Sequence, residues 1–211
     1  MSKTTLSTRI NHKSLVAKSM MAGLALGITS VASANDLSEV PSGMYKVDPT
    51  HAYITFSYNH LGLSNPVLAF DDFDIDLNLD NADPTKSTVN VSIDVNSVVT
   101  GSDIWKDHIT GGKWFDTANH PEITFASTKV EAGRDGNYTV TGDLTVKGES
   151  KPVQMVVTIN GAMNHPMSGT PTIGMEAEGE LLRSEFGLGA NTPFISDEVS
   201  LAVTAELGLA N

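Results

Sequence analysis

Apolar and polar residues alternate along most of this chain. In the segment FDDFDIDLNLD, Phe73, Ile75, Leu77 and Leu79 alternate with acidic and amide side chains. A period of two places one set of side chains on each face of a β-strand. The same pattern recurs along the chain, in residues 52–58, 87–95, 122–130, 137–146, 151–161, 172–182 and 198–210. We count about eight strands joined mostly by short turns, which predicts an all-β antiparallel meander that is closed into a barrel or folded into a sandwich.

The apolar faces of these strands should point inward, because too little helix remains to cover a sheet from outside. An eight-stranded barrel is just wide enough to be filled by its own side chains or to hold one small ligand. The inward residues are mostly Val, Ile, Leu and Met. Such a lining suits a flexible hydrocarbon chain better than a polar substrate. A filled core and a hollow one give the same period of two, so both alternatives stay open.

One long interruption breaks the alternation, the segment SDIWKDHITGGKWFDTANHPEITF from Ser102 to Phe125. Ser102 can cap a helix because its hydroxyl accepts from the free amides of a first turn. Gly111 and Gly112 supply the left-handed conformation that ends helices. The segment therefore predicts a short helix that forms a plug or flap.

Both tryptophans of the chain lie in this segment. Trp105 and Ile109 are four residues apart and share one face of the predicted helix, while Ile104 and His108 share another. Trp114 and the residue after it are expected to continue in extended form. The fold class is therefore all-β with one short helical insertion.

The first 34 residues differ in composition from the rest of the chain. They carry four basic residues and no acidic one, then an apolar run from Met20 to Val31, and end in the small-residue pattern ASA. This order is typical of a cleavable signal peptide, since a run of about twelve apolar residues is shorter than the roughly 20 that span a bilayer. We expect cleavage after Ala34, export to the periplasm, and a mature domain of residues 35–211 that begins with a loose leader up to Ser42.

Removal of the signal peptide leaves nine basic against 25 acidic side chains, a formal charge of −16. Such a surface repels phosphates, so we expect no nucleic acid as a partner. The chain contains no Cys, which excludes disulfides, thiolate metal sites, a thiol nucleophile and a lipoprotein anchor. No stable membrane anchor, cofactor or metal is expected, and the choice between a monomer and a homodimer stays open.

Four blocks of sequence resemble the successive blocks of the YceI-like family, in the same order and over essentially the whole mature chain. They are VDPTHAYITFSYNHLGLS, SDIWKDHITGGKWFDTANHPEITFAST, VTGDLTVKGESKPV and RSEFGLGANTPFISDEVSL. The resemblance implies an eight-stranded, lipocalin-like antiparallel barrel in an exported bacterial protein. It also implies a carrier or store for a polyisoprenoid or a related long-chain amphiphile, such as a quinone precursor, and no enzyme.

The candidate ligand-binding residues form two sets. The first is the apolar cavity wall of a hollow barrel, and the same residues are core if the barrel is filled. Its members are Phe56, Tyr58, Phe73, Ile75, Leu77, Val91, Ile93, Trp105, Ile109, Trp114, Phe115, Phe125, Met155, Val157, Met175 and Phe186. The second set, Asp107, His108 and Arg183, faces the polar head of a ligand or pins the plug to the barrel wall. Arg183 is the expected partner of Asp107 in that set.

Three alternatives to a carrier stay open. One is a stress-related periplasmic protein with a filled barrel and no ligand. Another is a hydrolase in which His108 activates Ser184, although no Gly-x-Ser-x-Gly elbow is present. The third is a metal site built from histidines, although none of them shows a spacing typical of metal ligands. The histidines weighed for it are His51, His60, His108 and His120.

Overall fold

The structure is a computed structural model that describes residues 37–134 and 136–210. The signal peptide expected in residues 1–34 lies outside these ranges. The described strands are β1 (Gly43–His60), β2 (Val67–Phe70), β3 (Phe73–Leu79), β4 (Thr88–Asp94), β5 (Val98–Val99), β6 (Glu122–Ala132), β7 (Tyr138–Val146), β8 (Glu149–Asn164), β9 (Pro171–Leu182) and β10 (Ile195–Leu209).

The described helices are few and short. They are α1 (Asp103–Thr110) and the 3-10 helices η1 (Leu37–Glu39), η2 (Pro84–Lys86), η3 (Val95–Ser97) and η4 (Arg183–Phe186). Within the described ranges, none of the helices has the length and apolar character that a membrane span requires.

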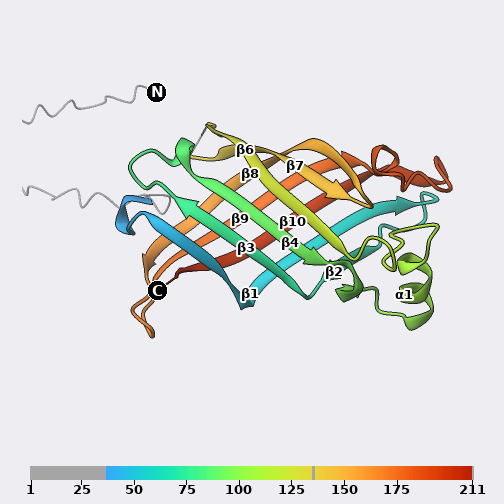
Figure 1. Ribbon diagram of the computed structural model, residues 1–211, viewed down its shortest axis with the longest axis horizontal. Helices are drawn as coiled ribbons and strands as arrows, with labels where there is room; N and C mark the ends of the chain where they lie inside the picture. Colours follow the sequence, from blue (N-terminus) through green and yellow to red (C-terminus); the bar gives the residue numbers. More distant parts are fainter. Residues whose placement is uncertain (1–36, 135, 211) are drawn as a thin grey trace, which may run out of the picture. The chain divides into compact units, whose positions relative to one another are not determined.

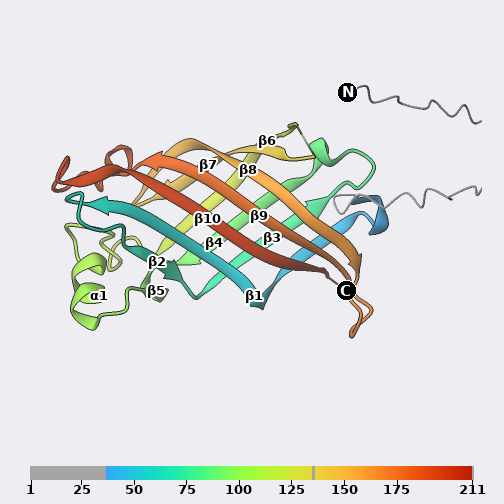
Figure 2. The ribbon, with the colours of Figure 1, turned by 180° about the vertical axis from the view of Figure 1, so that it is seen from behind.

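Eight of the strands close into an antiparallel barrel (Figures 1 and 2). Their order around the barrel is β1, β3, β4, β6, β7, β8, β9 and β10, and β10 pairs back with β1. This arrangement confirms the predicted all-β antiparallel barrel with one short helix. The short strands β2 and β5 were not predicted; β2 pairs with the second half of β1, and β5 pairs with β2.

Strand β1 pairs with three other strands because it bends near its middle. Residues 43–46 pair with β3, residues 54–57 pair with β2, and β10 runs along both halves. The pairing with β10 is interrupted between Val47 and Ala52, where the intervening residues bulge out of the ladder. The bulge lets one strand join the barrel wall to the short extension formed by β2 and β5.

The leader is packed against the barrel from Leu37 onward, so the expectation of a loose segment is wrong for residues 37–42. Leu37 is 6% exposed and Val40 is 1% exposed. The Tyr45 hydroxyl donates to the carbonyl of Pro41 at 2.7 Å, and the Asn81 amide donates to the carbonyl of Val40 at 2.7 Å. This segment (blue in Figure 1) covers the end of the barrel opposite α1.

Helix α1 begins as predicted, with the Ser102 hydroxyl accepting from the amide of Trp105 at 3.4 Å. Its end is different from the prediction, because Gly111 has φ −68° and ψ 166° and is not left-handed. Trp114 and Phe115 are also not extended. The Trp114 amide donates to the carbonyl of Gly111 at 2.9 Å, which folds this stretch into turns and returns both aromatic rings to the barrel.

Gly142 in β7 allows the Phe125 ring of β6 to lie across the neighbouring strand. A Cβ atom at Gly142 would be 2.3 Å from Cζ of Phe125 and 2.6 Å from the carbonyl oxygen of Ala126. Any side chain at this position therefore displaces either the ring or the backbone. The glycine is required by the close approach alone, since its φ is not positive.

We expect Gly142→Ala to lower the free energy of unfolding by roughly 1–3 kcal/mol, the usual cost of overpacking. Urea unfolding followed by circular dichroism measures it. Gly174→Ala in β9 is the control, because the nearest atom to a Cβ there lies at 3.8 Å, an ordinary contact. Equal unfolding midpoints for the two variants would contradict the proposed close approach.

Candidate functional site

The barrel encloses an apolar cavity of about 260 Å³. All eight strands of the closed barrel contribute side chains to its wall, and nearly all of these are apolar. An apolar cavity of roughly 150 Å³ already stays dry and holds a benzene-sized molecule. The core of this barrel is therefore hollow, which favours the ligand-binding alternative over the filled one.

Fifteen of the sixteen predicted wall residues line this cavity. The exception is Phe73, the first residue of β3, which packs against the core cluster without reaching the cavity. Leu37 of η1 and Phe70 of β2 also line the wall and were not predicted. Both come from elements that the alternation did not reveal, so no periodic signal marked them.

The cavity follows the barrel over much of its length. Along β10 its wall runs from Ile195 to Val203, which is roughly 26 Å at about 3.3 Å per residue. Leu37 and Pro84 line it at the end opposite α1, and Trp105 lines it at the α1 end. A cavity of this form suits a chain-like molecule better than a compact one.

Aromatic rings close the α1 end of the cavity. Phe56 of β1 stacks on Phe70 of β2 with ring centroids 5.4 Å apart. Phe115 from the turns after α1 meets both rings edge-on, at 6.2 Å from Phe56 and 6.1 Å from Phe70. Trp105 and Trp114 meet at 6.1 Å. The segment around α1 is thus a plug, as predicted, and its rings form the wall where it enters the barrel.

Among the described residues, Arg183 is the one charged side chain in the cavity wall. It is 5% exposed and anchors the loop between η4 and β10. Its guanidinium donates to four backbone carbonyls: Nε to Ser196 at 2.7 Å, Nη2 to Ile195 at 2.9 Å, and Nη1 to Leu188 and to Ala190, the latter at 3.0 Å. Burial lowers the pKa of Arg183, partly offset by the nearby Asp197 carboxylate, and a guanidinium remains charged in proteins.

The expected ion pair between Arg183 and Asp107 is wrong. The Arg183 donors point to the carbonyls of its own loop, and its guanidinium lies 5.6 Å from the centre of the Trp114 ring. Asp107 is exposed and lines no part of the cavity. Arg183 therefore holds the loop beside the plug through backbone contacts and a cation–π contact.

A second depression of about 420 Å³ lies outside the plug. Tyr58, Trp105, Trp114 and Ile195 line both this depression and the barrel cavity. The other lining residues are His60, Pro66, His108 and Asn191. His108 therefore belongs to this outer surface, where its ring contacts Trp105 at 5.6 Å. The shared residues make this side of the barrel the candidate mouth of the cavity.

Comparison with known proteins agrees with this architecture. Residues 45–207 match the YceI-like domain. The chain belongs to the YceI-like family. A UPF0312 protein of Yersinia pestis (strain Pestoides F) is 36% identical over 164 residues, which cover 77% of this chain and 84% of that protein.

Solved structures of related barrels superpose on this YceI-like chain. BcnA of Burkholderia cenocepacia has 26% identity and a TM-score of 0.68, over 76% of this chain and 98% of BcnA. A polyisoprenoid binding domain from Saccharophagus degradans has 15% identity and a TM-score of 0.61, over 81% of this chain and 100% of that domain. The second likeness concerns the fold alone.

Ser184 lies at the surface of this YceI-like barrel and bonds to Asp197. Its hydroxyl donates to Oδ2 at 2.6 Å, and its amide donates to Oδ1 at 2.8 Å. No histidine hydrogen-bonds Ser184 in residues 37–134 and 136–210. The hydrolase alternative required His108 as a base for this serine, and the structure does not bring the two side chains together.

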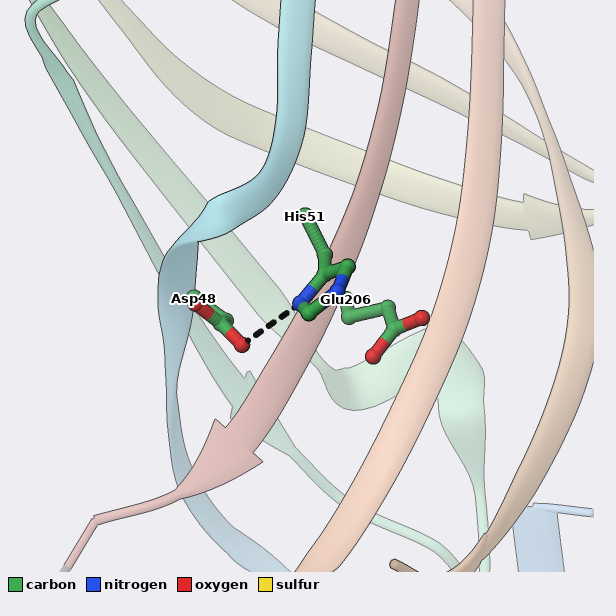
Figure 3. Close-up of side chains that lie close together, drawn as sticks. All are labelled: Asp48, His51 and Glu206. Atoms are coloured by element: carbon green, nitrogen blue, oxygen red, sulfur yellow. Dashed lines mark hydrogen bonds and ion pairs between the residues drawn. The ribbon is translucent and has the colours of Figure 1, made fainter.

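The histidines considered for a metal site are dispersed. His60 and His108 line the outer depression, and the His120 ring lies beside Gly148. His51 alone joins a group of three ligand-type residues in the described part of the chain, with Asp48 and Glu206 (Figure 3). Their oxygen and nitrogen atoms lie within 4.8 Å of one another.

Asp48 and His51 come from the β1 bulge, and Glu206 comes from β10 beside it. Nδ1 of His51 lies 3.0 Å from Oδ2 of Asp48, while the amide and the hydroxyl of Thr50 donate to Oδ1. These contacts satisfy the carboxylate of Asp48 without an ion. The arrangement is therefore that of a hydrogen-bonded turn, and the sequence could not reveal it because Glu206 lies far along the chain.

The same contacts shift the pKa values of Asp48 and His51 in opposite directions. The hydrogen bond from His51, with those from Thr50, lowers the pKa of Asp48 to about 2. The hydrogen bond to Asp48, helped by the charge of Glu206, raises the pKa of His51 above 6.5. The contribution of His51 to stability is therefore complete below pH 6.5 and is lost as the pH rises through its folded-state pKa. The contribution of Asp48 to stability is complete above the pKa that Asp48 has in the unfolded chain, and it is lost as the pH falls toward 2.

We expect Asp48→Asn to lower the pKa of His51 toward 6.5, because the variant loses the negative charge and the main acceptor. NMR titration of the imidazole protons measures both midpoints. Asp74→Asn removes an exposed carboxylate elsewhere on the barrel and serves as the control. An unchanged His51 midpoint in Asp48→Asn would contradict the hydrogen bond as the main cause.

Proposed function

We propose that this YceI-like protein carries or stores a polyisoprenoid or similar long-chain amphiphile inside its barrel. The observation that supports the proposal is the long cavity, whose wall is apolar from η1 at one end to the aromatic plug at the other. A hydrocarbon chain fits such a wall because the contact between the chain and the apolar side chains buries no unpaired polar group. A quinone precursor is one lipid of this class.

The energetics favour binding through the tail. Each methylene that leaves water contributes roughly 0.8 kcal/mol. Several such groups in the cavity offset the several kcal/mol that association costs in lost freedom. Affinity then follows the length of tail that the cavity accepts, while the few polar groups at the α1 end select the head.

The related proteins support this choice of ligand class. The Saccharophagus degradans protein is described as a polyisoprenoid binding domain, and its barrel superposes on the present one. The role proposed here is binding without catalysis. The described cavity wall includes hydroxyls of Thr55, Ser87 and two tyrosines, and no histidine or carboxylate of the described residues lines it to act as their base.

We also propose that the protein acts in the periplasm after export. The support is the composition of residues 1–34, with basic residues first, an apolar run next and small residues last. A lipid carrier in that compartment moves its ligand through an aqueous space. The strongly acidic composition keeps such a carrier soluble while it holds an apolar ligand.

The export proposal predicts a mature protein that begins at Asn35. N-terminal sequencing of protein purified from a periplasmic extract checks this. An Ala32→Tyr, Ala34→Tyr double variant should accumulate with its leader intact, because bulky residues block signal peptidase cleavage. A mature chain that still starts at Met1 in the wild type would contradict the proposal.

Filling the cavity should abolish binding without unfolding the barrel. Val157 of β8 points into the cavity and is 8% exposed, whereas its neighbour Val156 points outward and is 51% exposed. We expect Val157→Phe to weaken the binding of a polyprenol about tenfold or more, because the new ring occupies space for roughly two or more methylene groups. Val156→Phe is the matched control and should bind as the wild type does.

Tryptophan fluorescence titration and native mass spectrometry measure the binding. Equal polyprenol affinity in the two variants would show that the ligand lies outside the barrel. Failure of the wild type to bind any prenyl lipid, or to retain a lipid when purified from its own cell, would overturn the carrier function and favour a barrel that works without a ligand.

A further inference from the structure

Large apolar side chains project into water at the α1 end of the barrel. Ile104 of α1 is 86% exposed, Leu63 of the connection between β1 and β2 is 83% exposed, and Phe194 of the loop between η4 and β10 is 70% exposed. Leu61 and Val67, before and after Leu63, are exposed as well. Exposed apolar side chains that gather in one place mark an interaction surface. We call Leu63, Ile104 and Phe194 the apolar rim.

The apolar rim surrounds the outer depression that forms the candidate mouth of the cavity. Each of its three side chains lies within three residues of a residue that lines the depression. The amide of Leu61 donates to the carbonyl of Phe194 at 2.9 Å, and Nζ of Lys113 donates to Oδ1 of Asn191 at 3.1 Å. These contacts tie the β1–β2 connection and the plug to the loop before β10, at one end of the barrel (Figures 1 and 2).

We propose that the apolar rim docks on a lipid bilayer, with its side chains inserted among the acyl chains and the mouth facing the membrane. This docking surface rests on the proposed function, because a polyisoprenoid dissolves in a bilayer and not in water. Trp105 and Trp114 line both the depression inside the rim and the barrel cavity. A docked barrel therefore offers the tail a path from the acyl chains to the cavity that avoids water.

The shape and chemistry of this end favour a bilayer. The rim consists of separate tips on a turn, a helix and a loop, and such tips can enter between acyl chains one by one. Tyr58 and Trp105, which line the depression between them, have the ring types that favour the head-group level of a bilayer. A second copy of this chain fits the rim less well, because two strongly acidic proteins repel each other.

Charges of both signs border the rim. Asp103 and Asp107 are four residues apart on α1 and share a different face from Ile104, so these carboxylates can stay in water while Ile104 inserts. Lys106 and Lys113 form no ion pair within residues 37–134 and 136–210. Their long side chains can reach lipid phosphates. Since the charges offset one another, apolar insertion supplies the attraction, and docking should depend little on anionic lipid.

Co-sedimentation with vesicles of phosphatidylcholine, with and without added phosphatidylglycerol, tests the docking surface. We expect the wild type to bind both kinds of vesicle. The double variant Leu63→Gln, Ile104→Gln should bind about tenfold or more weakly, because it leaves two fewer large apolar side chains to withdraw from water. The matched control is Met163→Gln, Met167→Gln, which changes two exposed side chains at the opposite end of the barrel and should bind as the wild type does.

A spin label measures the insertion directly. The chain has no Cys, so a Leu63→Cys variant carries one nitroxide at the rim and a Met167→Cys variant carries one at the opposite end. On addition of vesicles, we expect the label at position 63 to become less accessible to a water-soluble nickel complex and more accessible to oxygen. The label at position 167 should keep its accessibility.

Polyprenol binding without vesicles separates this proposal from the carrier function. The Leu63→Gln, Ile104→Gln variant should keep the wild-type affinity for polyprenol, because neither residue lines the cavity. Equal vesicle binding by the two double variants, or a label at position 63 that stays in water, would overturn the docking surface and leave the carrier intact. A loss of polyprenol affinity in the rim variant would also overturn it, by assigning these side chains to the ligand.

Two further outcomes concern the wild type. If it binds no vesicles and light scattering shows a dimer that the rim variant lacks, the rim is a contact between two copies and the membrane proposal is wrong. If it binds vesicles through the rim but binds no polyprenol, the carrier function is overturned and the docking surface stands.

Discussion

Pairing between β1 and β10 is the constraint on which the rest of this structure depends. It joins the first and last strands of the barrel, and without it the sheet would have two open edges and two faces in water. Closure with eight strands fixes the width of the interior, and side chains of the size of Val, Ile and Leu leave part of that width empty. An eight-stranded barrel can be filled or hollow, and in this one the inward side chains leave a cavity between them.

The two ends of the cavity are covered by different physical means. At one end, Leu37 and Val40 cover it as ordinary buried apolar residues tied down by backbone contacts. At the other end, aromatic rings of the plug meet a loop that Arg183 holds through four carbonyls. The charged side chain of the described cavity wall, Arg183, therefore lies at the α1 end, while Ser87 and Tyr138 contribute hydroxyls elsewhere in an otherwise apolar wall.

Much of this could be predicted from the sequence, because alternation reports directly which face of a strand is buried. The inward positions Ile75, Leu77 and Val157 follow from period two alone, and Ser102 marked the start of α1 through capping chemistry. Whether the barrel is hollow could not be predicted, since a filled core has the same pattern. The answer depends on how the side chains of opposite strands pack against each other in the folded barrel, and the alternation along one strand does not report this packing.

The errors have physical reasons as well. The helix end at Gly111 was predicted from glycine's freedom to be left-handed, but an extended glycine followed by turns ends the helix equally well. Arg183 was assigned to Asp107 because opposite charges attract, whereas the fold places the guanidinium among the carbonyls of its own loop and leaves Asp107 exposed. The strands β2 and β5 are too short for a period to be visible. Leu37 lies in a polar stretch where one buried residue leaves no pattern.

The pairing of β1 with β10 also governs the order in which the chain can fold. Tyr45 lies opposite Leu209 and Tyr58 lies opposite Val199, so the contacts that complete the barrel join the two extremes of the described sequence. Contacts between distant residues must overcome the entropy of a long loop before they stabilise anything, which makes such topologies slow to form. A partly synthesised chain has its first strand but not the partner of that strand. This barrel therefore closes after synthesis of the chain is complete, and until then its apolar faces need protection from one another.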